Sequence, residues 1–174
     1  MSQRPKLPPR TSARVVLLDD DGAVLLLCGS DPALDETAPR WWFTVGGKVL
    51  PGEALAAAAV RELAEETGLR AEPLTVIGPC WRRDSTIRFN GAVMNSAEFY
   101  FVHRTRRFDP VPDRRTALEQ RYIHGHRWCH PADIAALAAG GQTVYPTQLG
   151  ELLVEANLLA DGGAAVAEQP RRIS

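Results

Sequence analysis

One segment constrains the fold of this 174-residue chain more than any other: "GGKVLPGEALAAAAVRELAEETGL", residues 46–69. Read as a helix at about 100° per residue, its second half places two acids within about 60° of a third, so that all three share one face. These acids are Glu62, Glu65 and Glu66. Small apolar residues fall on the opposite side, namely Ala56, Val60, Leu63 and Ala64. A small apolar face suits a helix that lies closely on a β-sheet, so the segment predicts a two-sided helix packed on a sheet.

The acidic face of this helix has two interpretations. Like charges at helical spacing repel one another by roughly 0.2–0.5 kcal/mol per pair, which a solvated surface tolerates. A hard divalent cation would reverse the sign of this interaction, because Mg²⁺ and Mn²⁺ prefer oxygen ligands. Arg61 stands one turn before Glu65, and an ion pair between them would orient that carboxylate.

The remaining chain alternates short apolar runs with turn residues. Runs at 13–18 and 23–28, joined by Asp-Gly, predict a hairpin, and "WWFTV" from Trp41 predicts a further strand. More strands are expected at 74–77, 80–89, 97–103 and within "RYIHGHRWCH", and helices at 116–120, 131–140 and 146–160. Strands mixed with helices without a regular βαβ rhythm indicate an α/β fold with a mixed sheet packed between helices.

The length suits one domain, which we place at residues 13–160. Residues 1–12 are rich in proline and predict a flexible N-terminal arm. Residues 161–174 are rich in glycine, alanine and charged residues and predict a flexible C-terminal tail.

Composition excludes several classes of function. The net charge of −1 provides no global field that would attract nucleic acid or an anionic membrane. No apolar run reaches the roughly 18 residues of a spanning helix, and the N-terminus lacks the apolar centre of a secretory signal. Three scattered cysteines suit a reducing compartment, so we expect a cytoplasmic protein without a membrane or stable nucleic-acid partner. The sequence leaves open whether the protein forms a homodimer.

The spacing within the acidic segment resembles a known signature. Gly47 is followed after five residues by Glu53, and after seven more by "RELAEETGL", residues 61–69. This matches every fixed position of the Nudix box, the motif of Nudix hydrolases, although many members carry glutamate where this chain has Leu50. The resemblance extends over about residues 13–160. It implies a Nudix-type α/β/α sandwich in which a loop-helix-loop motif presents acids to a metal-bound diphosphate.

The same resemblance implies roles for individual residues. The acids of the helix resemble ligands of Mg²⁺ or Mn²⁺, with Glu65 and Glu66 the strongest candidates. The metal set implied in full is Gly47, through its carbonyl, with Glu53, Glu62, Glu65 and Glu66. Arg61 resembles the residue that orients these glutamates by ion pairing.

The implied activity is hydrolysis of the diphosphate linkage in a nucleoside diphosphate derivative, with water attacking phosphorus. Because the general base differs among family members, Glu98 and Glu119 are alternatives to the acids of the box. The second hypothesis is a module that binds or senses a nucleotide or related metabolite without hydrolysing it. The sequence does not identify the substrate beyond a small-molecule diphosphate.

Further candidates lie outside the acidic segment. Arginines can grip phosphate and aromatic rings can stack on a base, so the candidate substrate contacts are Trp41, Trp42, Lys48, Arg82 and Arg83. Zinc is an alternative use of the histidines and cysteine in "HGHRWCH", but strand alternation would spread these side chains over both sheet faces.

Overall fold

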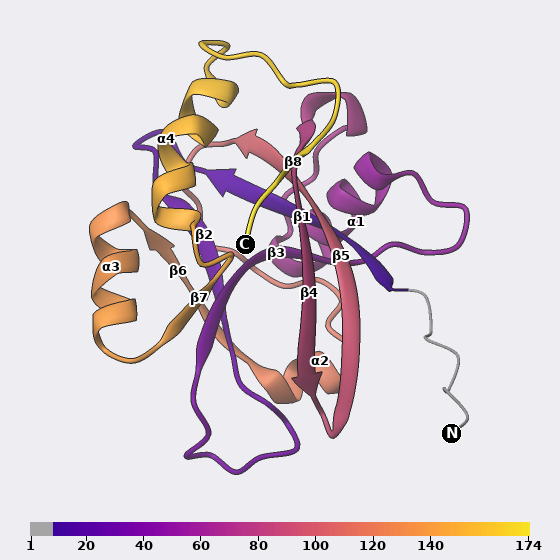
Figure 1. Cartoon of the computed structure of the whole chain (residues 1–174), viewed down its shortest axis with the longest axis vertical. Helices are drawn as coiled ribbons and strands as arrows, with labels where there is room; N and C mark the ends of the chain where they lie inside the picture. The colour runs from indigo at the N-terminus through magenta and orange to yellow at the C-terminus, as the bar shows by residue number, and fades with distance from the viewer. Residues whose placement is uncertain (1–8) are drawn as a thin grey trace, which may run out of the picture.

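The computed structural model describes residues 9–174. Within that range the strands are β1 (Arg10–Leu18), β2 (Val24–Gly29), β3 (Trp41–Lys48), β4 (Ile77–Phe89), β5 (Ala92–Arg104), β6 (Ile123–Cys129), β7 (Thr143–Tyr145) and β8 (Arg171–Arg172). The α-helices are α1 (Leu55–Thr67), α2 (Ala117–Tyr122), α3 (Pro131–Ala139) and α4 (Leu149–Ala160) (Figure 1). The acidic helix, the strand from Trp41 and the helix opened by Pro131 are thereby confirmed.

The strands form one mixed sheet in the order β6-β2-β3-β1-β5-β4-β8, and β7 pairs with β3. β1 runs parallel to β5 over its full length and antiparallel to β3. The predicted hairpin is only partly correct, since β1 and β2 meet at the single pair Leu18 and Val24. Beyond the turn the strands diverge, because β2 pairs with β3 and β6 instead.

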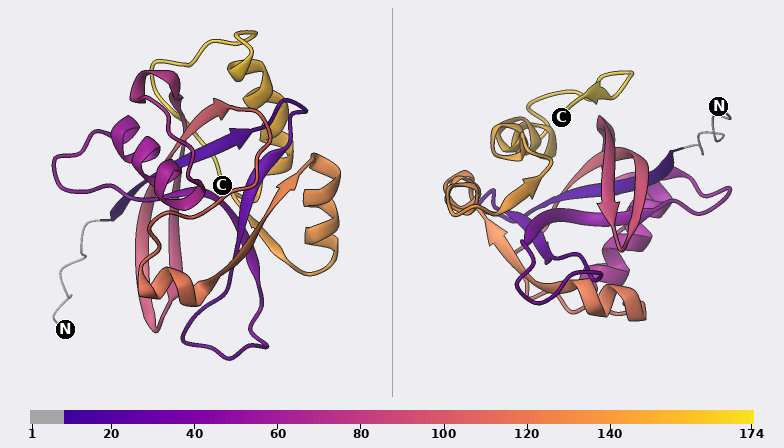
Figure 2. Two further views of the ribbon diagram at one scale, coloured as in Figure 1. Left: turned by 180° about the vertical axis from the view of Figure 1, so that it is seen from behind. Right: turned by 60° about the horizontal axis from the view of Figure 1, so that its bottom comes forward.

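Two hydrophobic cores lie on opposite sides of the sheet. The alternation of β1 supplies both: Val15 and Leu17 pack with α1, whereas Val16 and Leu18 pack with α3 and α4. The right-hand view of Figure 2 shows the sheet between these two helical layers. This is the α/β/α sandwich with a mixed sheet that the sequence led us to expect.

One local prediction was wrong. Residues 74–77 were expected to form a strand, but Pro73–Thr75 forms a 3₁₀ turn and Leu74 is fully exposed. Proline at the first position presets the dihedral angle of such a turn, and Leu74 has no core to enter.

The chain ends differ from the expected boundaries. β1 begins at Arg10, inside the predicted N-terminal arm, while residues 1–8 of that arm lie outside the described range. At the other end, β8 runs parallel to β4, and Ile173 donates its N–H to the Arg82 carbonyl at 2.9 Å. Ile173 also packs on the α3–α4 core, so the last residues lie on the sheet and do not extend freely.

Within residues 9–174, no helix combines the length and the apolar character needed to cross a membrane.

Candidate active site

The orientation of α1 differs from the one expected from the helical wheel. Leu63 is buried, as predicted, but Ala56, Val60 and Ala64 are only half-buried, and the buried residues include Ala59, Glu62 and Glu66. Two of the three acids therefore face the sheet beside the apolar residues, and Glu65, whose side chain is 34% exposed, lies at the edge of that face. The wheel placed the acids opposite the apolar face because it contains no information about what the sheet presents to the helix.

The sheet presents bare backbone to these acids. The Gly46 N–H donates to Glu66 Oε2 at 3.0 Å, and a Cβ at Gly47 would lie 2.6 Å from Glu62 Oε1. A Cβ at Gly46 would lie 2.2 Å from the Ala13 carbonyl oxygen, and Gly46 has a φ of 143°. Both glycines are thus required sterically, since no side chain fits between β1, β3 and the two carboxylates.

Burial of the acids raises their proton affinity. Desolvation, followed by the charge of Glu62, raises the pKa of Glu66 to about 8 even though the Gly46 N–H favours the carboxylate. The pKa of Glu62 is also raised, chiefly by burial, against the opposing effect of Arg61. Two adjacent carboxyl groups that resist ionisation form a site at which a cation would be strongly favoured.

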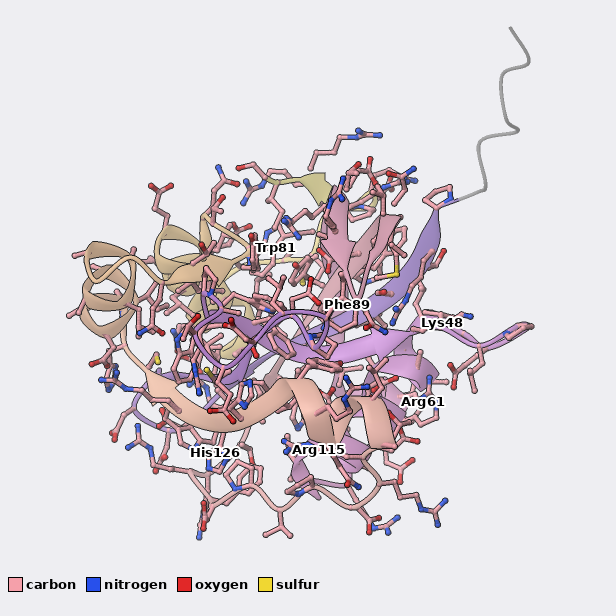
Figure 3. All side chains as sticks on the ribbon, turned by 90° about the horizontal axis from the view of Figure 1, so that it is seen from below. Lys48, Arg61, Trp81, Phe89, Arg115 and His126 are labelled. Carbon is pink, nitrogen blue, oxygen red and sulfur yellow. The ribbon has the colours of Figure 1, made fainter. Side chains whose placement is uncertain are left out.

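Arg61 binds the other acids together. Its guanidinium makes two hydrogen bonds to Glu53, at 2.8 and 2.9 Å, and one to Glu62 at 3.0 Å. A longer bond of 3.3 Å reaches Glu65, and Nη2 donates to the Lys48 carbonyl at 2.9 Å. Arg61 and Lys48 lie side by side in Figure 3. Because of the hydrogen bonds from Arg61, the pKa of Glu53 is lowered, so this carboxylate stays charged.

A row of alternating charges lies on the three strands beside these acids. Glu98 on β5 accepts from Arg14 on β1 at 3.3 Å, from Arg83 on β4 at 2.6 Å and from the Tyr100 hydroxyl at 3.2 Å. Arg14 also donates to the Gly46 carbonyl at 3.0 Å, which links the row to the acid site. Burial alone would raise the pKa of Glu98, but its two arginine partners lower it overall.

Aromatic rings border this row. The guanidinium of Arg14 lies 5.9 Å from the centre of the Phe43 ring, and that of Arg83 lies 5.1 Å from the Tyr145 ring. Strand β3 and its neighbour β7 thus cover one side of the row. We call this cluster of side chains, contributed by β1, β5 and β4 and by β3 and β7, the arginine chamber; its members are Arg14, Arg83, Glu98, Phe43 and Tyr145.

A second set of rings lies at the end of the long β4–β5 hairpin. Phe89 makes edge contacts with Trp41, at 6.4 Å between ring centres, and with Tyr122, at 5.0 Å. The Asn90 N–H reaches Asp31 in the β2–β3 loop at 3.0 Å. The hairpin tip, that loop and α2 therefore meet at one end of the molecule (Figure 1).

The structure separates the predicted substrate contacts. Arg83 lies in the arginine chamber and Trp41 in the ring cluster at the hairpin tip, but Trp42 packs on the α3–α4 core and donates to Gln142 at 2.6 Å. Arg82, one residue before Arg83, points to the other side of the sheet and pairs with Asp84 at 3.0 Å. The side chain of Lys48 is exposed at the end of β3.

The two alternative bases are both engaged by the protein. Glu98 is held by two arginines, as described above. Glu119 forms a capping box at the start of α2, where its Oε2 accepts from the Thr116 N–H at 2.7 Å. The preceding loop is joined to α1 by bonds from the Asp113 and Arg114 N–H groups to the Glu65 carbonyl.

The histidines and cysteine of β6 do not converge. Cys129 lies in the α3–α4 core, His126 contacts Asp109 at 3.2 Å, and His124 contacts Ser30. In residues 9–174 no three His, Cys, Asp or Glu side chains are grouped closely enough to form a ready metal site, the acids of α1 included. Arg61 forms ion pairs with two of these acids, Glu62 and Glu65, and with Glu53 in the loop before α1.

A separate cavity lies elsewhere on the molecule. It has a volume of about 510 Å³ and lies between α4 and the β1–β2 turn, lined by residues that include Asp20, Arg104, His130 and Asn157. None of the acids of α1 lines it, and its arginine is already bonded to Asp161 and Asn157.

Sequence reasoning missed the arginine chamber. Arg14 interrupts the apolar run "ARVVLL" at a position that faces inward, and Tyr145 ends a three-residue strand that is too short to predict. A charged residue in the middle of a buried strand was the available signal, because such a residue requires a partner.

The comparisons with known proteins agree with this geometry. The family model described as the NUDIX domain matches residues 8–148. A NUDIX hydrolase structure from Nitrosomonas europaea is 25% identical, with a TM-score of 0.59, and the match covers 92% of this chain and 94% of that one. An Ap4A hydrolase from C. elegans is 21% identical, with a TM-score of 0.53 and coverage of 88% and 98%.

A MutT/nudix family protein from Enterococcus faecalis is 15% identical, with a TM-score of 0.51; the match covers 74% of this chain and 46% of that longer one. The family model covers well over half of the chain, and it includes the whole acidic segment. The chain therefore belongs to the Nudix hydrolase family.

Proposed function

We propose that this protein hydrolyses the diphosphate linkage of a nucleotide-derived small molecule with the help of Mg²⁺ or Mn²⁺. One observation carries the proposal: Glu62 and Glu66 are buried side by side against the backbone of Gly46 and Gly47. Burying two adjacent carboxylates costs stability unless a positive charge accompanies them. A protein that only needed a stable helix would place apolar residues there.

The donor set fits a hard cation. Carboxylate and carbonyl oxygens of Gly47, Glu62, Glu65 and Glu66 would hold it, with Glu53 completing the network through Arg61. Such a cation would neutralise the oxygens of the diphosphate and the charge that develops during attack by water.

The side chains around the acids have separate tasks in this proposal. Arg61 fixes the orientation of Glu53 and Glu62, which keeps the site preorganised. The Gly46 N–H holds one oxygen of Glu66 and leaves the other available. Arg14, held by Glu98 and the Gly46 carbonyl, is positioned to bind a phosphoryl oxygen beside the acids.

The proton acceptor is then one of the α1 acids. Glu98 has a lowered pKa and three hydrogen-bond donors on its two oxygens, which makes it a poor base. Glu119 is partly used by its capping box. The acids of α1 border the position of the diphosphate directly.

The experiment that tests the proposal is a substrate panel with purified protein. Nucleoside triphosphates, dinucleoside polyphosphates, nucleotide sugars and coenzymes are incubated with Mg²⁺, with Mn²⁺ or with EDTA, and phosphate, pyrophosphate and nucleotide products are measured. Dinucleoside polyphosphates are included because a structural neighbour is named as an Ap4A hydrolase.

Matched variants distinguish the acids of the proposed site from an acid elsewhere on the surface. Glu65→Gln and Glu66→Gln should each lower turnover by orders of magnitude while the fold is retained. Glu151→Gln, on the exposed side of α4, should leave turnover unchanged. Binding of panel compounds without any product in either metal would favour the binding module over the hydrolase.

A further inference from the structure

Arg10 lies on β1, four residues before Arg14, although the sequence placed it in a flexible arm. It is the first residue of β1 and pairs in register with Ser96 of β5. Strand alternation puts its side chain on the same face as Arg14, which belongs to the arginine chamber. The next residue, Thr11, accepts the N–H of Val49 at 2.9 Å, so Arg10 also adjoins the loop that leads to α1.

Unlike the arginines of the chamber, Arg10 has no partner within residues 9–174. Arg14 and Arg83 share Glu98, at 3.3 and 2.6 Å. Among the described residues no carboxylate pairs with Arg10, and its Nε is buried without any hydrogen-bond partner. The β1, β4 and β5 walls therefore hold three guanidinium groups against one carboxylate.

The pKa of Arg10 reflects its lack of a partner. Its pKa is lowered by burial and by the charge of Arg14, and the opposing effects of Tyr122, Glu62 and Glu98 do not compensate. A buried donor without an acceptor lowers stability, and more so when it is charged. An anion placed against Arg10 would remove this cost, particularly once a cation had taken up the charge of Glu62 and Glu66.

An anion bound by Arg10 would lie farther along β1 than the diphosphate that the acids of α1 are proposed to bind. Arg14 is opposite Gly46, where Glu66 is bound, and Arg10 is four residues earlier on β1. At about 3.3 Å per residue, the two Cα atoms are about 13 Å apart. A group bound by Arg10 is therefore remote from the bond that the acids address.

We propose that Arg10 binds a further phosphoryl group of the substrate, distal to the diphosphate held at α1. This inference rests on the proposed function and narrows the substrate class to compounds with at least three phosphoryl groups. Arg10 is then a specificity residue. Diphosphates joined to a neutral moiety leave it unpaired and bind more weakly.

The test measures binding and does not depend on turnover. Inorganic tripolyphosphate and inorganic pyrophosphate are titrated calorimetrically into the protein with saturating Mg²⁺. Arg10→Gln should weaken tripolyphosphate binding at least tenfold and pyrophosphate binding less than threefold, with Arg10→Lys between wild type and Arg10→Gln. Arg127→Gln removes an exposed strand arginine paired with Asp133 and serves as the control, with both affinities unchanged.

Two results would overturn the inference. One is tripolyphosphate binding to Arg10→Gln that equals binding to wild type; the other is an equal loss for both anions, which would place Arg10 at the diphosphate itself. Thermal melting confirms that each variant is folded, and Arg10→Lys retains the charge should Arg10→Gln unfold.

The proposed function can fail separately. If the wild type hydrolyses no compound of the panel but tripolyphosphate binding still depends on Arg10, the hydrolase proposal is wrong and the anion site stands. If the wild type hydrolyses diphosphates while Arg10→Gln binds tripolyphosphate normally, only the role of Arg10 is lost.

Discussion

Replacing Glu66 with glutamine should stabilise the protein while removing its activity. The carboxyl group is buried, and its pKa is raised from 4.5 to about 8 by desolvation and by Glu62. A raised pKa of an acid means that the unfolded chain loses the proton more readily. Stability is therefore unaffected below about pH 4.5, falls as the pH rises from there, and reaches its full loss above about pH 8.

The magnitude follows from the size of this pKa shift. At about 1.4 kcal/mol per pH unit, the full cost is about 5 kcal/mol above pH 8 and about 3 kcal/mol at pH 7. Glutamine has nearly the same shape, and its carbonyl can still accept the Gly46 N–H, so the hydrogen bond is retained. The variant should thus be more stable than wild type by an amount of this order.

The assay is urea unfolding of both proteins in EDTA at pH 5, 7 and 9. The gap in the free energy of unfolding should widen from pH 5 to pH 9, and Mg²⁺ should narrow it by stabilising wild type alone. If Glu66→Gln is no more stable than wild type at pH 9, or if the gap does not change with pH, the carboxylate is not held charged in a desolvated site and the reasoning fails.

Three further predictions concern the surroundings of the acids. Gly47→Ala should lower turnover at least tenfold, because the new Cβ would lie 2.6 Å from a Glu62 oxygen; Gly125→Ala, where a Cβ meets no atom within 4 Å, should have no effect on turnover. Glu98→Gln should destabilise the fold by about 3 kcal/mol in urea unfolding, because two buried arginines lose their carboxylate, whereas a loss of turnover at unchanged stability would make Glu98 the general base. Ile173→Ala should lower the unfolding free energy by about 1 kcal/mol, because Ile173 packs on the core. An unchanged unfolding free energy would instead support the flexible C-terminal tail that the sequence predicted.

The parts of the fold that the sequence predicted well depend on local patterns. The acidic helix, its glycine end at Gly68 and the helix from Pro131 to Gly140 all have strong capping or periodicity signals. The predicted hairpin was only partly correct because its turn was recognised but the partners of each strand were not. Strand pairing depends on residues that are far apart in the chain, and a turn does not specify them.

The candidate site also has a part that the sequence predicted and a part that only the folded structure shows. The resemblance to the Nudix box grouped Glu53, Arg61 and the three glutamates of α1, and the family model supports the motif that contains them. The wheel nevertheless assigned Glu62 and Glu66 to the wrong side of the helix. Their burial requires a sheet with two glycines at the point of contact, which only the packed structure supplies.

The sequence by itself predicted which residues would carry the chemistry, since the acids and the arginine of α1 stand within one or two turns of each other. Only the tertiary structure decided which charges are buried and which have partners. Arg10, Arg14, Arg83 and Glu98 come from three strands separated by up to 88 residues, and they meet because β1 lies parallel to β5 and β5 pairs with β4. Proton affinity and anion binding depend on which side chains lie close together in the folded protein. Both are set by desolvation and by neighbouring charges in space and not by position along the chain.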